Sequence, residues 1–472
     1  MFPKQTLAKK LNVEIATSVV MDNAIQLWTN MYKDHPPWLG GEANVKSLNL
    51  PATISEELAR LVLTEFKAEI SGSQRADFIS NALDITFNNL SNIVEMWCAL
   101  GGIALKPYVA GEDFITHNPT TIIVDVVQAN RFYPTSFDSN KNVTGAVFLE
   151  TKRIGDYAYT RIEYHSLVGT HYTVINKAFR SERLNTQLLE DENINVQHPF
   201  SEEISLEEVE EWKGLQPKTE IEGLEKPLFV YIKTPRANTI DTQSPLGASM
   251  YSRAVEIIKE ADKQYSRILW EYEAKEAAID ADETLFKSDK KGNSILPVGS
   301  ERLYRTYEFE ANGDGKSNFI QAYSPEIRDA SMFNGLNKLY RQIETLCGLA
   351  YGTLSDVADV QKTATEIKAS KQRSYTTVSA MQKAWEQGLN ELIYAMDMIC
   401  NLYKLTPAGT INTTLTWGDG VLEDTDVEYQ RRWSMVVAGK LKLEKFYEWY
   451  FGCSESEAAE MIPETTVYPP PE

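Results

Sequence analysis

One stretch near the middle of the chain, Ser244–Ile279, predicts a long uninterrupted helix and constrains the fold more than any other feature. Ser244 can accept a hydrogen bond from a free backbone N–H at the helix start, and Pro245 is tolerated in the first turn. An aromatic or aliphatic side chain recurs every seven residues along the stretch, at Tyr251, Ile258, Tyr265 and Tyr272. At about 1.5 Å per residue the helix would be roughly 45 Å or more long. Side-by-side packing with copies of itself is therefore favoured, and an ordinary surface helix of a large domain is the alternative.

Two further long helices are predicted on the C-terminal side of this stretch. Thr363–Leu405 carries apolar residues at heptad spacing over about four heptads, and Pro407 ends it. Pro325–Leu349 is the second helix, and the polar segment Asp280–Ser324, with strand-like runs around an Asn-Gly-Asp-Gly turn, precedes it. Two long helices that flank a small β-rich module predict a stalk with a tip. The tail is predicted to hold a strand, Ile411–Trp417, and two helices, Val427–Ala438 and Leu443–Phe451.

The N-terminal half has the pattern of an α+β domain. Helices are predicted over Ile54–Ile70 and over a run from Phe78 to about Leu100, which a Gly-Gly pair ends. Strands are predicted at Thr121–Val127, Gly145–Glu150, Tyr157–His165, Thr170–Ile175 and Pro227–Lys233. Residues 190–225 contain twelve Asp or Glu, and few of their apolar residues keep a period. We interpret this region as an acidic surface insertion, and a solvated linker without a partner is the alternative.

Composition excludes several classes of protein. The formal net charge of −20 argues against a broad basic surface that grips phosphates, so a nucleic acid would slide past this protein more readily than it would be held. The four cysteines are scattered without Cys-x-x-Cys spacing, which indicates neither a disulfide framework nor a zinc ribbon. No segment has a signal peptide pattern or the roughly 18 apolar residues of a membrane span. We therefore expect a soluble protein made in the cytoplasm, with no membrane partner.

No constellation in the sequence argues for catalysis. The five histidines lack ligand spacing, and Walker A, Gly-x-Gly-x-x-Gly and Gly-x-Ser-x-Gly motifs are missing from the sequence. Asp280, Asp282 and Glu283 have the composition of a divalent metal cluster, but no matching carboxylates lie near them in the sequence. We expect no enzyme activity, no metal and no cofactor.

Several stretches, in this order, resemble portal proteins of tailed bacteriophages, in the siphophage-type family often labelled minor capsid protein. They are ISEELARLVLTEF, SNIVEMWCALGGIALKPYV, NRFYPTSFD, the PLFVYIKTP and SPLGASMYSRAVEIIKEADKQYSRILWEYE passage, EYQRRWSMVVAGKLKLEKFYEWYFG and SESEAAEMI. No single string is as diagnostic as a catalytic motif, but their order over more than 400 residues is specific.

The resemblance implies an α+β portal fold in a ring that is usually dodecameric, with a DNA channel along its axis. Its parts would be an α/β wing at 1–243 with the acidic insertion at 183–226, a stem helix at 244–279, a β-rich clip at 280–324, a second stem helix at 325–349, a tunnel loop, long wing helix and returning strand at 350–424, and a helical crown at 425–472. The insertion has no counterpart in the family that we can match.

The resemblance also implies a function. The ring would sit at a capsid vertex of the virion after assembly in the host cytoplasm, and double-stranded DNA would pass through it during packaging and ejection. The implied partners are the terminase large subunit, a head–tail adaptor, and the major capsid and scaffold proteins. In the tunnel loop we expect five residues to face the channel: Ser355, Asp356, Asp359, Gln361 and Lys362. In the clip, the candidate docking residues are Lys287, Lys290, Lys291, Arg302 and Arg305.

Two other functions stay open. A capsid adaptor could form rings without conducting DNA, and a blocked or narrow centre of the ring would favour it. A metal-dependent nuclease could use Asp280, Asp282 and Glu283, and a monomer in solution would favour that alternative.

Overall fold

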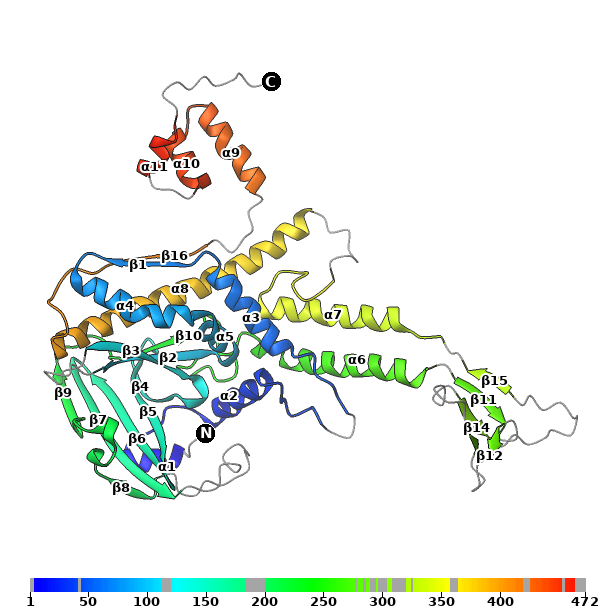
Figure 1. Cartoon of the computed structure of the whole chain (residues 1–472), viewed down its shortest axis with the longest axis horizontal. Coiled ribbons are helices and arrows are strands. Elements are labelled where there is room, and N and C mark those ends of the chain that lie inside the picture. The colour runs from blue at the N-terminus through cyan, green and yellow to red at the C-terminus, as the bar shows by residue number, and fades with distance from the viewer. Residues whose placement is uncertain are drawn as a thin grey trace, which may run out of the picture. The chain divides into compact units, whose positions relative to one another are not determined.

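The computed structural model describes most of the chain. The described residues are 4–40, 44–111, 120–182, 200–276, 278–282, 286–288, 294–295, 304–307, 320–323, 326–356, 364–418, 425–451 and 455–462. At some positions of the short strands between 278 and 323, and at the starts of three C-terminal helices, only the backbone is described. The chain divides into two compact units, Met1–Trp417 and Gly418–Glu472. Figure 1 labels their helices and strands. Both helices and sheets are present, so the α+β fold class is confirmed.

The first helices of the first unit are α1 (Lys4–Leu11), α2 (Val19–Tyr32), α3 (Leu50–Leu63), α4 (Gln74–Asn88) and α5 (Leu90–Leu100). The side chains of Ser18 and Ser73 cap α2 and α4 by accepting backbone N–H groups. The helix predicted over Ile54–Ile70 begins earlier and ends at Leu63, because the next residues form β1 (Lys67–Ser71), which pairs with β16 (Asn412–Thr416). That pairing joins segments far apart in the sequence, so local periodicity could not predict it.

Two antiparallel sheets follow these helices. The larger sheet has the order β4 (Tyr133–Phe137), β5 (Val143–Ile154), β6 (Tyr157–Val168), β7 (His171–Glu182), β8 (Glu202–Ile204), and β9 (Lys218–Glu222) also pairs with β7. The smaller has the order β10 (Val230–Lys233), β2 (Gly102–Ala110), β3 (Thr121–Gln128). The five strands predicted for the N-terminal half are confirmed, although β7 continues seven residues beyond its predicted end at Ile175, and β2 and β4 were not predicted.

Residues 200–225 of the predicted acidic surface insertion pack on the larger sheet, so the alternative of a solvated linker is wrong for them. β8 and β9 both pair with β7, and two short 3-10 turns lie between them. Leu206, Val209 and Trp212 recur at a spacing of three on one side of these turns and pack in one buried cluster with Ala178 of β7. The acidic residues occupy the exposed side, so the segment is a covering layer on the sheet edge. Residues 190–199 of the predicted insertion lie outside the described part of the chain.

The predicted helix Ser244–Ile279 is shorter than expected. α6 spans Val255–Ala274, and the residues from Ser244 to Tyr251 are not helical. They are buried as irregular chain because Met250 N–H donates to the carbonyl of Cys98 over 2.9 Å, and the hydroxyl of Thr234 donates to the carbonyl of Ala248 over 2.7 Å. A Cβ on Gly247 would lie 2.0 Å from the carbonyl oxygen of Gly101, so this segment touches the end of α5 closely.

α6 packs beside α7 (Asp329–Cys347), and Figure 1 shows the two helices lying along one another. At their far ends, Arg328 donates to both carboxylate oxygens of Glu271 over 3.1 and 2.9 Å, and Lys275 pairs with the same carboxylate over 2.6 Å. The hydrogen bonds from Arg328 and Lys275 hold the pKa of Glu271 at about 2. A small β-module of β11 (Ala278–Asp282), β12 (Lys287–Ser288), β13 (Ser294–Ile295), β14 (Tyr304–Tyr307) and β15 (Ile320–Tyr323) lies between α6 and α7 in sequence.

The predicted helix Thr363–Leu405 is confirmed as α8 (Ala364–Tyr403). Its heptad stripe is buried in the main core, at Val378, Trp385, Leu389, Leu392, Met396 and Ile399. Trp385 meets Trp97 of α5 edge to face at a centroid distance of 5.5 Å, and α8 also packs against β2 and β10. One core therefore joins α8 to the helices and the smaller sheet of the N-terminal half.

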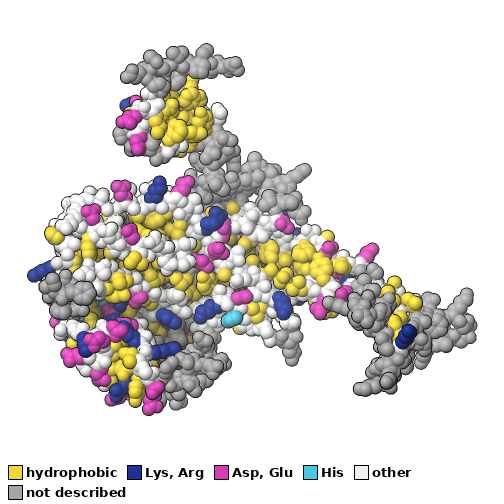
Figure 2. All heavy atoms as spheres, viewed as in Figure 1, with side chains coloured by type: hydrophobic (Ala, Val, Ile, Leu, Met, Phe, Trp, Pro, Cys, Tyr) yellow, Lys and Arg dark blue, Asp and Glu magenta, His cyan; other side chains and the backbone are white. Residues whose placement is uncertain are grey.

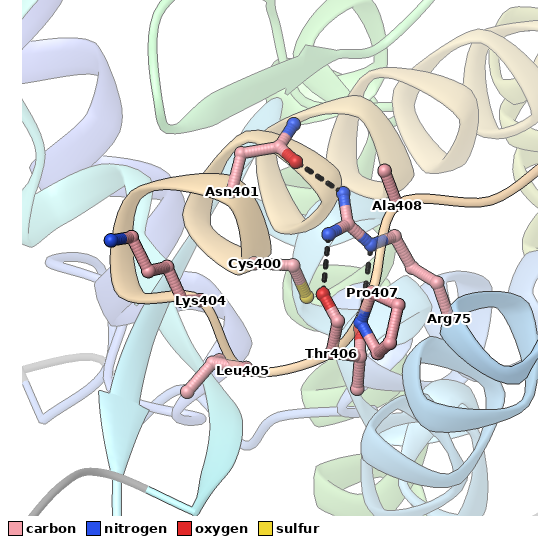
Figure 3. Close-up of a pocket in the computed structure, with 8 residues that line it drawn as sticks. All are labelled: Arg75, Cys400, Asn401, Lys404, Leu405, Thr406, Pro407 and Ala408. Carbon is pink, nitrogen blue, oxygen red and sulfur yellow. Dashed lines mark hydrogen bonds between the residues drawn. The ribbon is translucent and has the colours of Figure 1, made fainter.

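Arg75 on α4 holds the C-terminal end of α8 (Figure 3). Its guanidinium is buried and donates to Asp397 over 2.8 Å, to Asn401, and to the carbonyl of Thr406 over 2.6 Å. Arg75, Asn401 and Thr406 border a hollow of about 410 Å³. Through these hydrogen bonds, Arg75 joins α4 to the C-terminal end of α8.

We expect Arg75→Met to lower the free energy of unfolding by about 2–4 kcal/mol, because Asp397 and the end of α8 lose their buried donor. Denaturant unfolding of the purified protein measures this change. The matched control is Arg60→Met, which removes a guanidinium from the exposed pair with Glu57 and should cost less than about 1 kcal/mol. Equal effects of the two substitutions would contradict the assignment.

The second unit contains α9 (Thr425–Val437), α10 (Leu443–Phe451) and α11 (Glu455–Glu460). α9 and α10 agree with the two helices predicted here, and α11 was not predicted. Tyr429, Trp433 and Tyr450 pack around Phe446, which is buried. An aromatic core thus holds this small unit together.

Candidate functional site

The turn after α7 is built around one carboxylate. α7 ends at Gly348, which has a φ of 79° and donates its N–H to the carbonyl of Glu344. The Glu344 side chain is fully buried, and its Oε1 accepts the N–H groups of Gly352, Leu354 and Ser355 over 3.1, 2.7 and 2.9 Å. Its Oε2 accepts the hydroxyl of Ser355 over 2.9 Å. The described part of this turn is therefore a fixed structure.

The structure describes two of the five predicted tunnel-loop residues. Ser355 is buried with its hydroxyl bonded to Glu344, which corrects the expectation that it faces a channel. Asp356 is exposed, and its backbone N–H donates to the side chain of Asn337 over 2.9 Å. The other three, Asp359, Gln361 and Lys362, lie outside the described residues.

Two of the five predicted docking residues, Lys287 and Arg305, lie on described strands of the β-module. Lys287 is exposed on β12. Arg305 on β14 donates to Asp280 on β11 over 2.8 and 3.2 Å, and its guanidinium lies 4.5 Å from the ring centre of Tyr323. Lys290, Lys291 and Arg302 lie outside the described residues.

The same contacts bear on the nuclease alternative. The Asp280 carboxylate is occupied by Arg305, and a guanidinium beside it disfavours a cation. The side chain of Asp282 and all of Glu283 lie outside what the structure describes. Among the described residues, no group of three or more His, Cys, Asp or Glu side chains could hold a metal ion.

Hydrophobic side chains gather on the surface of the α6–α7 pair, as Figure 2 shows. Trp270 is 64% exposed, and Tyr272 and Phe333 are also exposed. Large aromatic side chains left in water are typical of a surface that a partner covers. Within the described part of the chain, no helix is long and apolar enough to cross a membrane.

Sequence reasoning missed a buried polar network between the two sheets. Leu228 N–H donates to the Tyr172 hydroxyl over 3.1 Å, and that hydroxyl donates to Nδ1 of His165 over 2.6 Å. Nε2–H of His165 donates to Glu163 over 2.8 Å, and Lys106 of β2 donates to Glu163 over 2.6 Å. The donors and acceptors are complementary when His165 is neutral. No fixed spacing in the sequence marks such a network, because its members meet only through the sheet register.

The network makes the first unit less stable in acid. Burial lowers the pKa of His165, and the bond to Glu163 offsets only part of this effect. Burial would raise the pKa of Glu163, but Lys106, His165 and Arg161 hold it well below its usual range. Below pH 6.5 the unfolded chain binds a proton at His165 that the folded chain does not bind, so stability falls with pH. At still lower pH Glu163 is protonated, and the folding stability that its lowered pKa provides is lost as well.

We expect His165→Gln to lower the free energy of unfolding by about 1–2 kcal/mol at pH 7, because a buried bond is lost. We also expect the loss of stability between pH 7 and pH 5 to shrink by up to about 1–2 kcal/mol. Denaturant unfolding at both pH values measures the two effects. His171→Gln, at a position 40% exposed in its side chain, is the control, and its slope is the reference for replacing a histidine outside the network. An unchanged slope in the His165 variant would contradict the prediction.

Comparisons with known proteins identify the family of this chain. A search of the curated proteins gives no match. Among solved structures, a chain from "Neck of native GTA particle computed with C12 symmetry" is 12% identical, with a TM-score of 0.40, covering 94% of this chain and 97% of that chain. The family model described as phage portal protein, SPP1 Gp6-like, matches residues 40–465. The match covers most of the sequence, and the chain therefore belongs to the SPP1 Gp6-like family of phage portal proteins.

Proposed function

We propose that this portal protein forms a closed ring at a capsid vertex, dodecameric as the family resemblance implies, and conducts double-stranded DNA along its axis. The family match over residues 40–465 carries the proposal. The terminase motor would drive DNA inward from the clip side during assembly in the host cytoplasm, and a head–tail adaptor would later dock at the same end. Major capsid and scaffold proteins would contact the ring inside the virion.

The surface of the α6–α7 pair supports a ring. Its exposed aromatic residues include Trp270 and Phe333, and neighbouring copies placed around an axis would cover them. The negative charge of the chain also supports conduction. Each phosphate that a protein neutralises adds affinity, so a channel with many basic contacts would hold the duplex in place. An acidic ring with few contacts lets DNA move.

End-on electron micrographs of the purified protein test the proposal. We expect a ring with an open centre wide enough for a duplex. A ring with a blocked centre would favour the adaptor function instead. Light scattering that gives only monomer or dimer at micromolar concentration, in salt that permits assembly, would contradict ring formation.

Within this ring we propose that Asp356, Asp359, Gln361 and Lys362 line the channel, with Lys362 as the contact to phosphate. We propose Lys287, Lys290, Lys291, Arg302 and Arg305 as the basic residues of the docking surface. Lys287 is exposed, which suits a docking role. Because Arg305 already pairs with Asp280, its contribution would be to hold two strands of the clip together.

A further inference from the structure

Glu344 organises the whole turn that follows α7. Two backbone N–H groups, those of Gly348 and Leu349, donate to its carbonyl, and four donors from the turn converge on its carboxylate. A buried carboxylate is costly unless donors surround it. Three of the donors are the backbone N–H groups of Gly352, Leu354 and Ser355, and the fourth is the hydroxyl of Ser355, so the carboxylate is satisfied only when the turn adopts this conformation.

A second side chain of α7 extends the attachment. Asn337 lies seven residues before Glu344, on the same face and about 10 Å away along the helix axis. Its Oδ1 accepts the N–H of Asp356 over 2.9 Å. The chain from Gly352 to Asp356 therefore runs back along α7, attached first at Glu344 and then at Asn337.

α8 closes the other side of the turn. A Cβ on Gly348 would lie 2.4 Å from the hydroxyl of Thr377, so α8 passes very close to the end of α7. The guanidinium of Arg373 lies 5.3 Å from the ring centre of Tyr351. The described turn is held between α7 and α8, so Glu344 is not the only residue that keeps it buried.

We infer that Glu344 is the positioning residue of the tunnel loop: its carboxylate fixes Gly352–Ser355 and so sets where the chain leaves α7 at Asp356. This inference rests on the proposed channel function. Glu344 touches no DNA and acts through the backbone of the turn. The amount of DNA that the ring packages depends on this attachment.

Two substitutions at Glu344 test the inference. Glu344→Gln keeps a carbonyl oxygen for the three N–H donors, and its amide can donate to the hydroxyl oxygen of Ser355. Glu344→Leu keeps a similar side-chain volume and removes both carboxylate oxygens, so the four donors of the turn lose their acceptors. The control is Gln342→Leu, at an exposed position of the same helix. The reference for a defective loop is a ring from which residues 359–361 are deleted.

The readouts are ring assembly, hydrogen exchange in peptides covering 349–356, and packaged DNA. We expect all rings to assemble. In the Leu variant, exchange should be about tenfold faster or more, because the turn amides lose their acceptor, and packaged DNA should fall to the level of the loop deletion. The Gln variant and the Gln342→Leu control should match wild type.

The outcomes separate this inference from the proposed function. A Leu variant that packages normally, while the loop deletion does not, overturns the role of Glu344. If both package normally, the channel role of the loop fails instead. If the Leu variant does not assemble, Asn337→Ala decides, since it removes only the acceptor of Asp356: a packaging defect in intact rings supports the inference, and normal packaging overturns it.

Discussion

Replacement of residues 278–324 by a bridge of about four Gly or Ser residues is expected to abolish binding of the terminase motor and of the head–tail adaptor while rings still form. The structure starts the β-module at Ala278, two residues before the boundary predicted from the sequence. The contacts that hold the ends of α6 and α7 together do not involve the β-module. Glu271 is bound by Arg328, and Lys275 donates to the carbonyl of Glu326 over 2.7 Å, so the two chain ends lie close enough for a bridge of about 14 Å at most.

Co-sedimentation of rings with the motor protein measures the loss, and light scattering measures assembly. The control is a ring in which the exposed β5–β6 turn at Gly155 and Asp156 carries a Gly/Ser replacement, which should bind the motor as wild type does. Lys287→Glu in the intact clip is a finer variant and should weaken binding by about fivefold or more if basic residues recognise the motor. Motor binding retained by the deletion would refute the clip assignment.

Long, strongly periodic elements could be predicted from the sequence because each carries its own signal. The stripe that includes Val378 and Trp385 repeats over several turns, and α8 was therefore predicted nearly to its ends. The Ser-Pro start at Ser244 suggested a helix cap, but burial of Leu246 and Met250, together with the bond of Met250 N–H to Cys98 of α5, outweighs that local preference. Competition between local propensity and tertiary packing is not visible in one sequence.

Strands and turns that depend on contacts between distant segments could not be predicted either, because one sequence does not show those contacts. β2 contains Pro107 and follows a helix directly, and it becomes a strand only because β3 and β10 supply its partners. Ser355 was expected to face the channel because the family resemblance places it in the tunnel loop, whereas its bond to Glu344 requires the turn to fold back onto α7. In the sequence, Glu344 is one of two acidic residues on the amphipathic helix α7, and nothing marks it as buried.

Shortening of the tunnel loop by deletion of residues 359–361, or replacement of Lys362 by Glu, is expected to lower packaged DNA by about two- to tenfold without changing ring assembly. In the proposed channel, Lys362 of each subunit would contribute one weak phosphate contact, and each such contact adds to the affinity and to its dependence on salt. A ring of such contacts follows the duplex without gripping it, and a ring of glutamates repels it. The defect of the Glu variant should therefore shrink as the salt concentration rises.

Packaging assays with purified rings, motor and DNA at two salt concentrations measure this effect. Lys383→Glu is the matched control, because it makes the same change of charge at an exposed position in the middle of α8, about 30 Å along that helix from the loop. A defect equal to that of the Lys362 variant would mean that total ring charge, and not a contact in the loop, limits packaging. If the Lys362 variant and the shortened loop both assemble and package a full genome at the normal rate, the segment is only a connector between α7 and α8. The channel contact must then be sought on another part of the subunit.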